Sequence, residues 1–229
     1  MFNTNDRTVF SARLTRWGGL ALMLAGLLIA IPTLFHPSDA DPRAFQNVAW
    51  TPVHALLIVG AILSLFGLIG LYRVQAERTG ALGLAGFVLS MIGTALVVAA
   101  LVADAFVLPI LSADPAGQAL LDPAGPLFSG ALGLVFLLMG VTFALGSMLL
   151  GFATARSGVL PRWAGALILV GGPLLAFTPP LPTSVGLVGA LLLGAGYLWA
   201  GYAIWLARPP VRWFSRAGRA PYTDLQQAW

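Results

Sequence analysis

Six long apolar segments, joined by short polar connections, limit what this chain can fold into. A helix needs about 20 mostly apolar residues to cross a hydrocarbon core about 30 Å thick. In lipid, a single helix can span the membrane because it forms its backbone hydrogen bonds within its own segment. We therefore expect an all-α polytopic bundle of six transmembrane helices. The segments run from Trp17 to Phe35, Pro52 to Tyr72, Ala81 to Ala103, Leu127 to Phe152, Arg162 to Phe177 and Val185 to Leu206.

The composition supports the same class of protein. Hydrophobic residues make up 59% of the chain and charged residues 9%, whereas soluble domains carry about 25% charged residues. So few charges cannot cover a water-facing surface, which indicates an integral membrane protein. The chain has no cysteine, so disulfides, thiolate metal sites and iron–sulfur clusters are excluded.

The positions of arginine predict the orientation. All twelve basic residues are arginines, and all but Arg43 lie before the first segment, after the sixth, or in the connections after the second and fourth. The positive-inside rule then puts both termini in the cytoplasm. We expect residues 1–16 to be a short basic cytoplasmic N-terminus, 17–207 the six-helix transmembrane domain, and 208–229 a basic aromatic tail on the inner leaflet.

Two further expectations concern the source and the first helix. A chain whose basic residues are all arginines, and which is rich in alanine, glycine and proline, is typical of a GC-rich bacterial genome. We therefore expect the protein to lie in a bacterial cytoplasmic (inner) membrane. The first apolar run is long for a signal peptide and is followed by Pro37, so we expect it to remain as an uncleaved helix.

Glycines recur seven residues apart in every expected helix. Seven residues make about two turns, so each pair lies on one face and lets a neighbouring backbone approach closely. This spacing predicts a tightly packed bundle. The pairs are Gly19/Gly26, Gly60/Gly67, Gly86/Gly93, Gly133/Gly140, Gly165/Gly172, Gly189/Gly196 and Gly194/Gly201.

Polar chemistry gathers at one end of the expected bundle. Both histidines lie in the stretch from His36 to His54, and Asp104 ends the third apolar segment at the same depth. We expect Thr51 to cap the second helix. Imidazole with carboxylate is a common ligand set for divalent metals, so His36, His54 and Asp104 are candidate metal ligands.

The two histidines leave other interpretations open. Two imidazoles can also ligate a haem, as in b-type cytochromes. The commoner alternative is an interfacial histidine bonded to a backbone carbonyl or to Asp39. No catalytic or cofactor-binding motif is recognisable in the sequence.

Several short motifs resemble those of a group of bacterial six-helix integral membrane proteins that have no assigned activity. They are His36-Pro37, Trp50 followed by Pro52-Val53-His54, Asp104-Ala105-Phe106, and the run from Gly158 to Gly165. The likeness covers most of residues 13–207. It implies a fold and a membrane location, and no reaction.

The interiors of the expected helices hold no ionisable residue near the midplane, which weighs against proton relays and ion-coupled transport. We expect the serines and threonines there to bond between helices. The favoured interpretation is a non-enzymatic accessory or assembly subunit, or a binder of lipid or small molecules. Its expected partners are the bilayer and other membrane subunits or a second copy, and no nucleic acid. The alternatives are a metal- or haem-binding enzyme or redox protein, and a small transporter.

Overall fold

The computed structural model describes residues 4–37, 43–122, 125, 129–177 and 182–207, with the side chains described from residue 13 onward. The regular structure of these residues is entirely helical, as expected. The expected tail 208–229 lies outside them, as do Asp39 and Asp41. The elements are α1 (Thr4–Thr33), the 3-10 helix η1 (Ala44–Gln46), α2 (Trp50–Phe106), α3 (Leu108–Ser112), α4 (Pro115–Leu120), α5 (Gly130–Ser157), α6 (Arg162–Ala176) and α7 (Thr183–Leu206).

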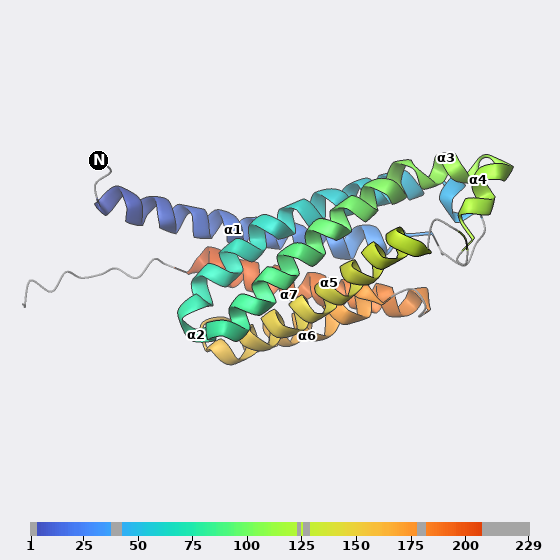
Figure 1. The fold of residues 1–229 in the computed structure, drawn as a ribbon. Helices are drawn as coiled ribbons and strands as arrows, with labels where there is room; N and C mark the ends of the chain where they lie inside the picture. Colours follow the sequence, from blue (N-terminus) through green and yellow to red (C-terminus); the bar gives the residue numbers. More distant parts are fainter. Residues whose placement is uncertain (1–3, 38–42, 123–124, 126–128, 178–181, 208–229) are drawn as a thin grey trace, which may run out of the picture.

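Helix α2 is a hairpin whose two arms, residues 50–79 and 81–106, run antiparallel (Figure 1). The chain reverses at Gly80, which has φ 54° and ψ −147°. Glycine adopts positive φ without a side-chain clash. At the open end of the hairpin, the hydroxyl of Thr51 donates to the carbonyl of Ala105 at 3.0 Å. The expectation that Thr51 caps the helix is wrong, because α2 begins one residue earlier and this hydroxyl joins the two arms.

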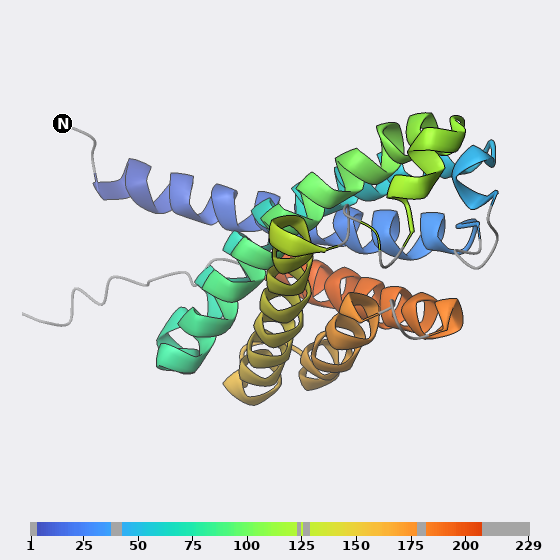
Figure 2. The same cartoon turned by 45° about the vertical axis from the view of Figure 1, so that its right-hand side comes forward.

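The helices form a closed ring. Helix α1 packs between α2 and α7, α7 packs on α6, α6 on α5, and α5 on α2. Counting the two arms of α2 separately, six helical segments surround a common interior (Figures 1 and 2). The N-terminal helix is thus a direct neighbour of the last helix, although they are far apart in sequence.

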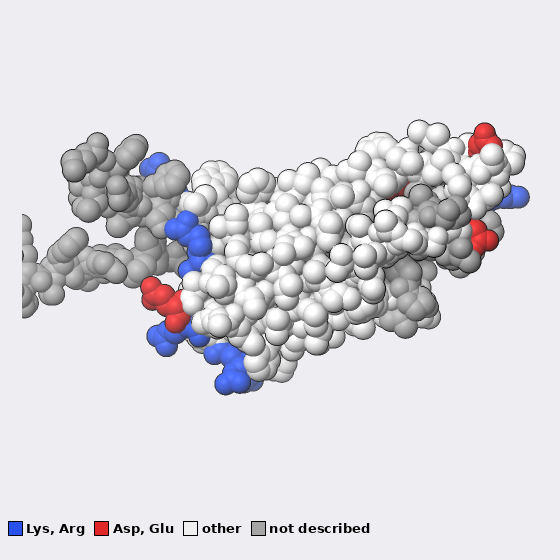
Figure 3. All heavy atoms as spheres, viewed as in Figure 1, with Lys and Arg blue, Asp and Glu red and all other residues white. Residues whose placement is uncertain are grey.

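Four of the described helices are long and apolar enough to cross a membrane: α1 from Arg13, α2 with its extension to Ser112, α5 and α7. This supports a multi-pass membrane protein. Helix α6 is apolar but has only 15 residues, about 22 Å of helix. In the face seen in Figure 3, charged side chains gather at the two ends and leave an uncharged band between them.

We name the two ends by their residues. The arginine end holds the start of the apolar part of α1, the Gly80 turn and the connection between α5 and α6. The histidine end holds His36, η1, α3 and α4, and with them Arg43. The other arginines whose side chains are described, all at the arginine end, are Arg13, Arg16, Arg73, Arg78, Arg156 and Arg162.

The helices at the histidine end differ in part from the sequence expectation. The turn expected near residues 116–121 is present as α4, whose first backbone N–H groups are capped by Asp114 (Oδ1 to Ala116 N, 2.7 Å). Helix α3 was not expected. Helix α5 begins at Gly130 and continues to Ser157, beyond the predicted end at Phe152.

Glycine contacts hold neighbouring helices together, as the seven-residue spacing predicted. A Cβ added to Gly201 of α7 would lie 2.5 Å from the carbonyl oxygen of Gly19 of α1, and one on Gly19 would lie 2.9 Å from that of Gly201. Similar backbone contacts join α2 to α5 at Gly86. Gly140 is different: among described atoms, an added Cβ would meet only the carbonyl oxygen of Ala176, at 3.7 Å.

The expectation of interhelical bonds from hydroxyl groups is wrong for three residues. Ser64, Thr142 and Ser147 each donate to a carbonyl one turn back in their own helix, at 2.6–2.9 Å. The buried interhelical bond instead runs from Gln75 Nε2 of α2 to Thr154 Oγ1 of α5, at 2.9 Å.

A glycine in tight backbone contact and a glycine beside open space should respond in opposite ways to substitution by alanine. Gly140→Ala should leave stability unchanged or raise it by up to about 1 kcal/mol, because alanine favours helix and the site has room. Gly201→Ala should cost about 1–3 kcal/mol through overpacking against α1. Thermal unfolding in detergent measures both. Equal shifts for the two variants would contradict the proposed α1–α7 contact.

Candidate functional site

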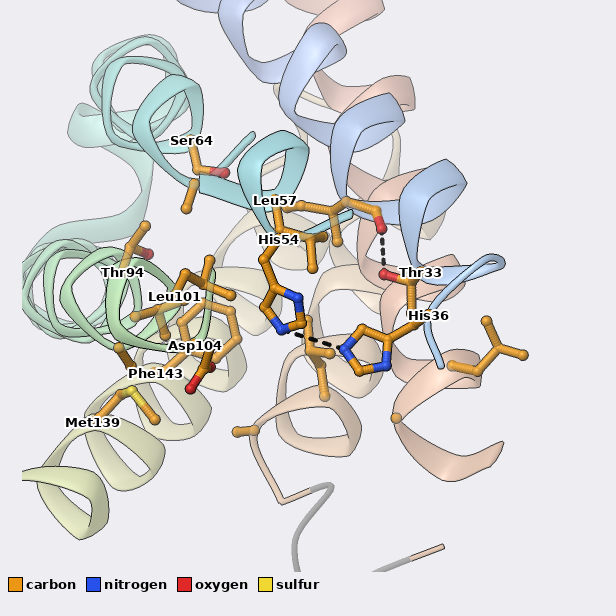
Figure 4. A pocket seen from close by; sticks show the side chains of 18 of the residues that line it. Thr33, His36, His54, Leu57, Ser64, Thr94, Leu101, Asp104, Met139 and Phe143 are labelled. Atoms are coloured by element: carbon orange, nitrogen blue, oxygen red, sulfur yellow. Dashed lines mark hydrogen bonds between the residues drawn. The ribbon is translucent and has the colours of Figure 1, made fainter. Parts of the chain in front are cut away.

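A cavity of about 400 Å³ occupies the half of the ring nearer the histidine end (Figure 4). All six helical segments contribute to its wall. One representative from each segment, in chain order, is Ile29, Ala61, Val97, Gly140, Leu175 and Leu187. The cavity therefore exists only when the ring is closed.

The cavity follows from the size of the inward-facing residues. Toward the arginine end the interior is filled by large, fully buried side chains: Leu22, Leu68, Leu71, Leu150, Ile168 and Ile204. Toward the histidine end many wall positions are small: Ala61, Ser64, Ala100, Gly140, Ala176 and Gly186. Protein interiors are normally close-packed, so six small residues facing one another leave a space that the flanking helices cannot close.

Polarity is unevenly distributed along this cavity. His36, His54 and Asp104 line its outer part, and His36 and Asp104 are partly exposed, so the cavity reaches the molecular surface there. The deeper wall is mainly apolar and reaches Ser64, which lies ten residues beyond His54 and about 15 Å further along the helix. Thr94 lines this part too. Tyr197 also lines the cavity, on α7.

The structure brings the two predicted histidines together. Their Nε2 atoms are 3.4 Å apart, and their ring centroids 4.9 Å. Asp104 lines the same cavity from the second arm of α2, as Figure 4 shows. In the described part of the chain, however, no three His, Cys, Asp or Glu side chains are close enough to form a metal-binding group.

Backbone carbonyls determine which nitrogen of each histidine carries a proton. His36 Nδ1 lies 2.7 Å from the carbonyl oxygen of Pro37, and His54 Nδ1 lies 2.8 Å from that of Trp50. A carbonyl oxygen only accepts, so each Nδ1 must be the N–H donor. In a neutral ring Nε2 is then the acceptor. Two acceptor nitrogens face each other, and a shared proton or another cation is needed to make that contact favourable.

Trp50 positions all three candidate residues. Its ring centroid lies 4.3 Å from that of His54 and 5.2 Å from that of His36, and its Nε1 donates to the backbone carbonyl of Asp104 at 2.6 Å. Phe45 packs edge-on against the same indole, at 4.8 Å between centroids. Trp50 is thus a support of the site.

Trp50 lies at a helix end, where tryptophan is common in membrane proteins, but its side chain is only 3% exposed and packs inside the protein. Its place four residues before His54 is the signal that could have revealed its role, because residues four apart share a helix face.

The commoner alternative for the histidines, bonding to a backbone carbonyl, is what both Nδ1 atoms do. It does not exclude a ligand-binding role, because the carbonyls occupy one nitrogen and leave Nε2 facing the other ring. Comparisons with known protein families, curated proteins and solved structures find no match to this chain. The function must therefore be argued from the site itself.

Trp50→Phe tests the support of the site. Phenylalanine keeps an aromatic ring but cannot donate to the Asp104 carbonyl, and the loss of this part-buried hydrogen bond should cost about 0.5–1.5 kcal/mol. Thermal unfolding in detergent measures this loss. The matched control is Trp199→Phe, since Trp199 is 44% exposed and should tolerate the change. Equal effects of the two variants would argue against a structural role for the indole.

Proposed function

We propose that this protein is a six-crossing bacterial inner-membrane protein, with both termini in the cytoplasm, that binds a small amphiphilic molecule in the cavity. A lipid or lipid-like molecule fits this description. The observation that carries the proposal is a cavity with mainly apolar walls that has two histidines and a carboxylate at one end. The established features are helices of membrane-spanning length and a closed ring; the ligand is our inference.

The six-crossing count rests on the hairpin and on α6. Each arm of α2 exceeds the roughly 20 residues that a crossing requires. Helix α6 is shorter, and it crosses if the residues after Ala176 complete the span or the bilayer thins locally. Arginines gathered at one end of the ring favour placing that end, and both termini, in the cytoplasm.

The cavity has the size and polarity of a ligand site. Small-molecule pockets have volumes of about 300–1,000 Å³, with mostly apolar walls and a few convergent polar groups. Here the polar group of a ligand would meet His36, His54 and Asp104. An alkyl portion would extend between the aliphatic walls toward Ser64, where burial contributes about 0.8 kcal/mol for each methylene.

The packing of the ring favours a binder over an assembly subunit. An assembly subunit would need close-packing faces for its partner, but glycine faces such as those of Gly19 and Gly201 pack on each other inside the ring. A transporter would need a path through the arginine half, where large side chains such as Leu68 and Leu150 fill the interior. Neither alternative explains the cavity as directly.

Filling the cavity should abolish ligand binding without unfolding the protein. Ala61 lines the cavity and is buried, so Ala61→Phe would occupy the space of an alkyl chain. We expect the wild type to retain a lipid-like molecule through purification and to bind a fluorescent fatty acid, and the variant to lose at least about 10-fold in affinity. Mass spectrometry of organic extracts and a fluorescence titration measure the two quantities.

Ala95→Phe is the matched control, because Ala95 is exposed on the same hairpin and does not line the cavity. It should bind as the wild type does. The proposal fails if the wild type binds no amphiphile, or if Ala61→Phe, shown to be folded, binds as well as Ala95→Phe.

The orientation can be tested with single cysteines, since the chain has none of its own. In intact spheroplasts, Val48→Cys should react with a membrane-impermeant thiol reagent, because Val48 is 91% exposed at the histidine end. Glu77→Cys, near the Gly80 turn, should react only after the membrane is permeabilised. The reverse labelling pattern would invert the proposed topology.

A further inference from the structure

The contact between the two histidines carries an inference of its own. We propose that His36 and His54 bind one divalent d-block metal ion of the zinc class at the outer end of the cavity. The site does not depend on the proposed amphiphile. When both are present, the ion would add a Lewis acid to the polar end of the cavity.

The separation of the two nitrogens fits a single ion. Histidine nitrogens bind Zn²⁺ at about 2.0–2.1 Å, and tetrahedral angles then place two such nitrogens about 3.4 Å apart. The Nε2 atoms of His36 and His54 are 3.4 Å apart. A haem needs the two imidazoles on opposite faces of a porphyrin, and this contact leaves no room for a macrocycle between the rings. The geometry therefore favours one ion over haem.

The surroundings of the two rings are those of metal-binding histidines. Such histidines usually donate their other N–H to a carbonyl or carboxylate, which fixes the tautomer and the ring orientation. Both Nδ1 atoms here donate to backbone carbonyls, of Pro37 and Trp50. The indole of Trp50 packs on both rings. The two Nε2 atoms thus lie 3.4 Å apart, with both Nδ1 atoms engaged elsewhere, before any ion binds.

Asp104 provides the negative charge that two neutral imidazoles lack. Its side chain lines the same cavity (Figure 4), so a cation between the histidines would share a largely apolar cavity with a carboxylate. With two protein nitrogens as ligands, the remaining positions of the ion are open to water or to the polar group of a cavity ligand. An open position is typical of catalytic zinc, whereas structural zinc sites are closed.

The experiment exploits the small number of possible ligands, since the chain holds two histidines and no cysteine. Full-length protein with a histidine-free affinity tag is stripped with a chelator, and Zn²⁺ alone is titrated by calorimetry. We expect one ion per chain. His36→Gln and His54→Gln should each weaken binding at least about 10-fold, and Asp104→Asn should weaken it less.

Asp114→Asn is the matched control, because Asp114 caps α4 outside the cavity and asparagine also caps helices. It should bind Zn²⁺ as the wild type does. Spectra of protein labelled with ¹⁵N-histidine give an independent readout. Zn²⁺ should shift both Nε2 signals while both Nδ1 atoms stay protonated.

The proposal is overturned if stripped wild-type protein shows no saturable binding, or if folded histidine variants bind as tightly as the control. It is also overturned if the ¹⁵N signals show a proton shared between the two Nε2 atoms that Zn²⁺ does not displace. No amphiphile is added, so failure here would leave the cavity proposal unaffected, and failure of fatty-acid binding would leave this one unaffected.

Discussion

The contact between α1 and α7 is the interaction on which the rest of the structure depends. It closes the ring, and glycines on both helices bring the two backbones together, as at Gly19 and Gly201. Lipid offers little hydrophobic driving force for helix association, so close backbone packing must supply much of the attraction. Without this contact the six segments would form an open layer. The interior, including the cavity, would then face lipid.

Within the closed ring, residue size determines where the interior is solid. Large aliphatic side chains fill the arginine half, and small residues leave the histidine half hollow. The polar residues lie at the outer end of that hollow and are held by carbonyls and by Trp50. The packed arginine half thus stabilises the ring, and the histidine half contains a cavity with polar side chains at its end. This division explains how so apolar a chain can still present a specific site.

Much of this arrangement follows from local sequence signals. Apolar length predicted the helices, and the seven-residue glycine spacing predicted their close contacts. The position of both histidines at helix ends predicted that they lie at one end of the fold. These predictions succeed because they depend on residues near one another in sequence.

The errors concern contacts between distant residues. The cavity requires small residues on five of the six segments to face one another, which no single helix reveals. Thr51 was expected to cap its own helix and instead bonds to Ala105, 54 residues away. The packing of His36 against Trp50 joins the end of α1 to the start of α2, which neither segment reveals alone. Gly140 shares the periodicity of the packing glycines, but its neighbours leave it beside a space.

The hydrogen bonds at the open end of α2 also affect how a molecule could reach the interior. Trp50 bonds to the carbonyl of Asp104, and Thr51 bonds to that of Ala105, so the two arms are fastened beside the histidines. A molecule that parted the arms would have to break both bonds. The first of these bonds also steadies the indole on which His36 and His54 pack. Entry between the arms would therefore remove a hydrogen bond that supports the two imidazoles.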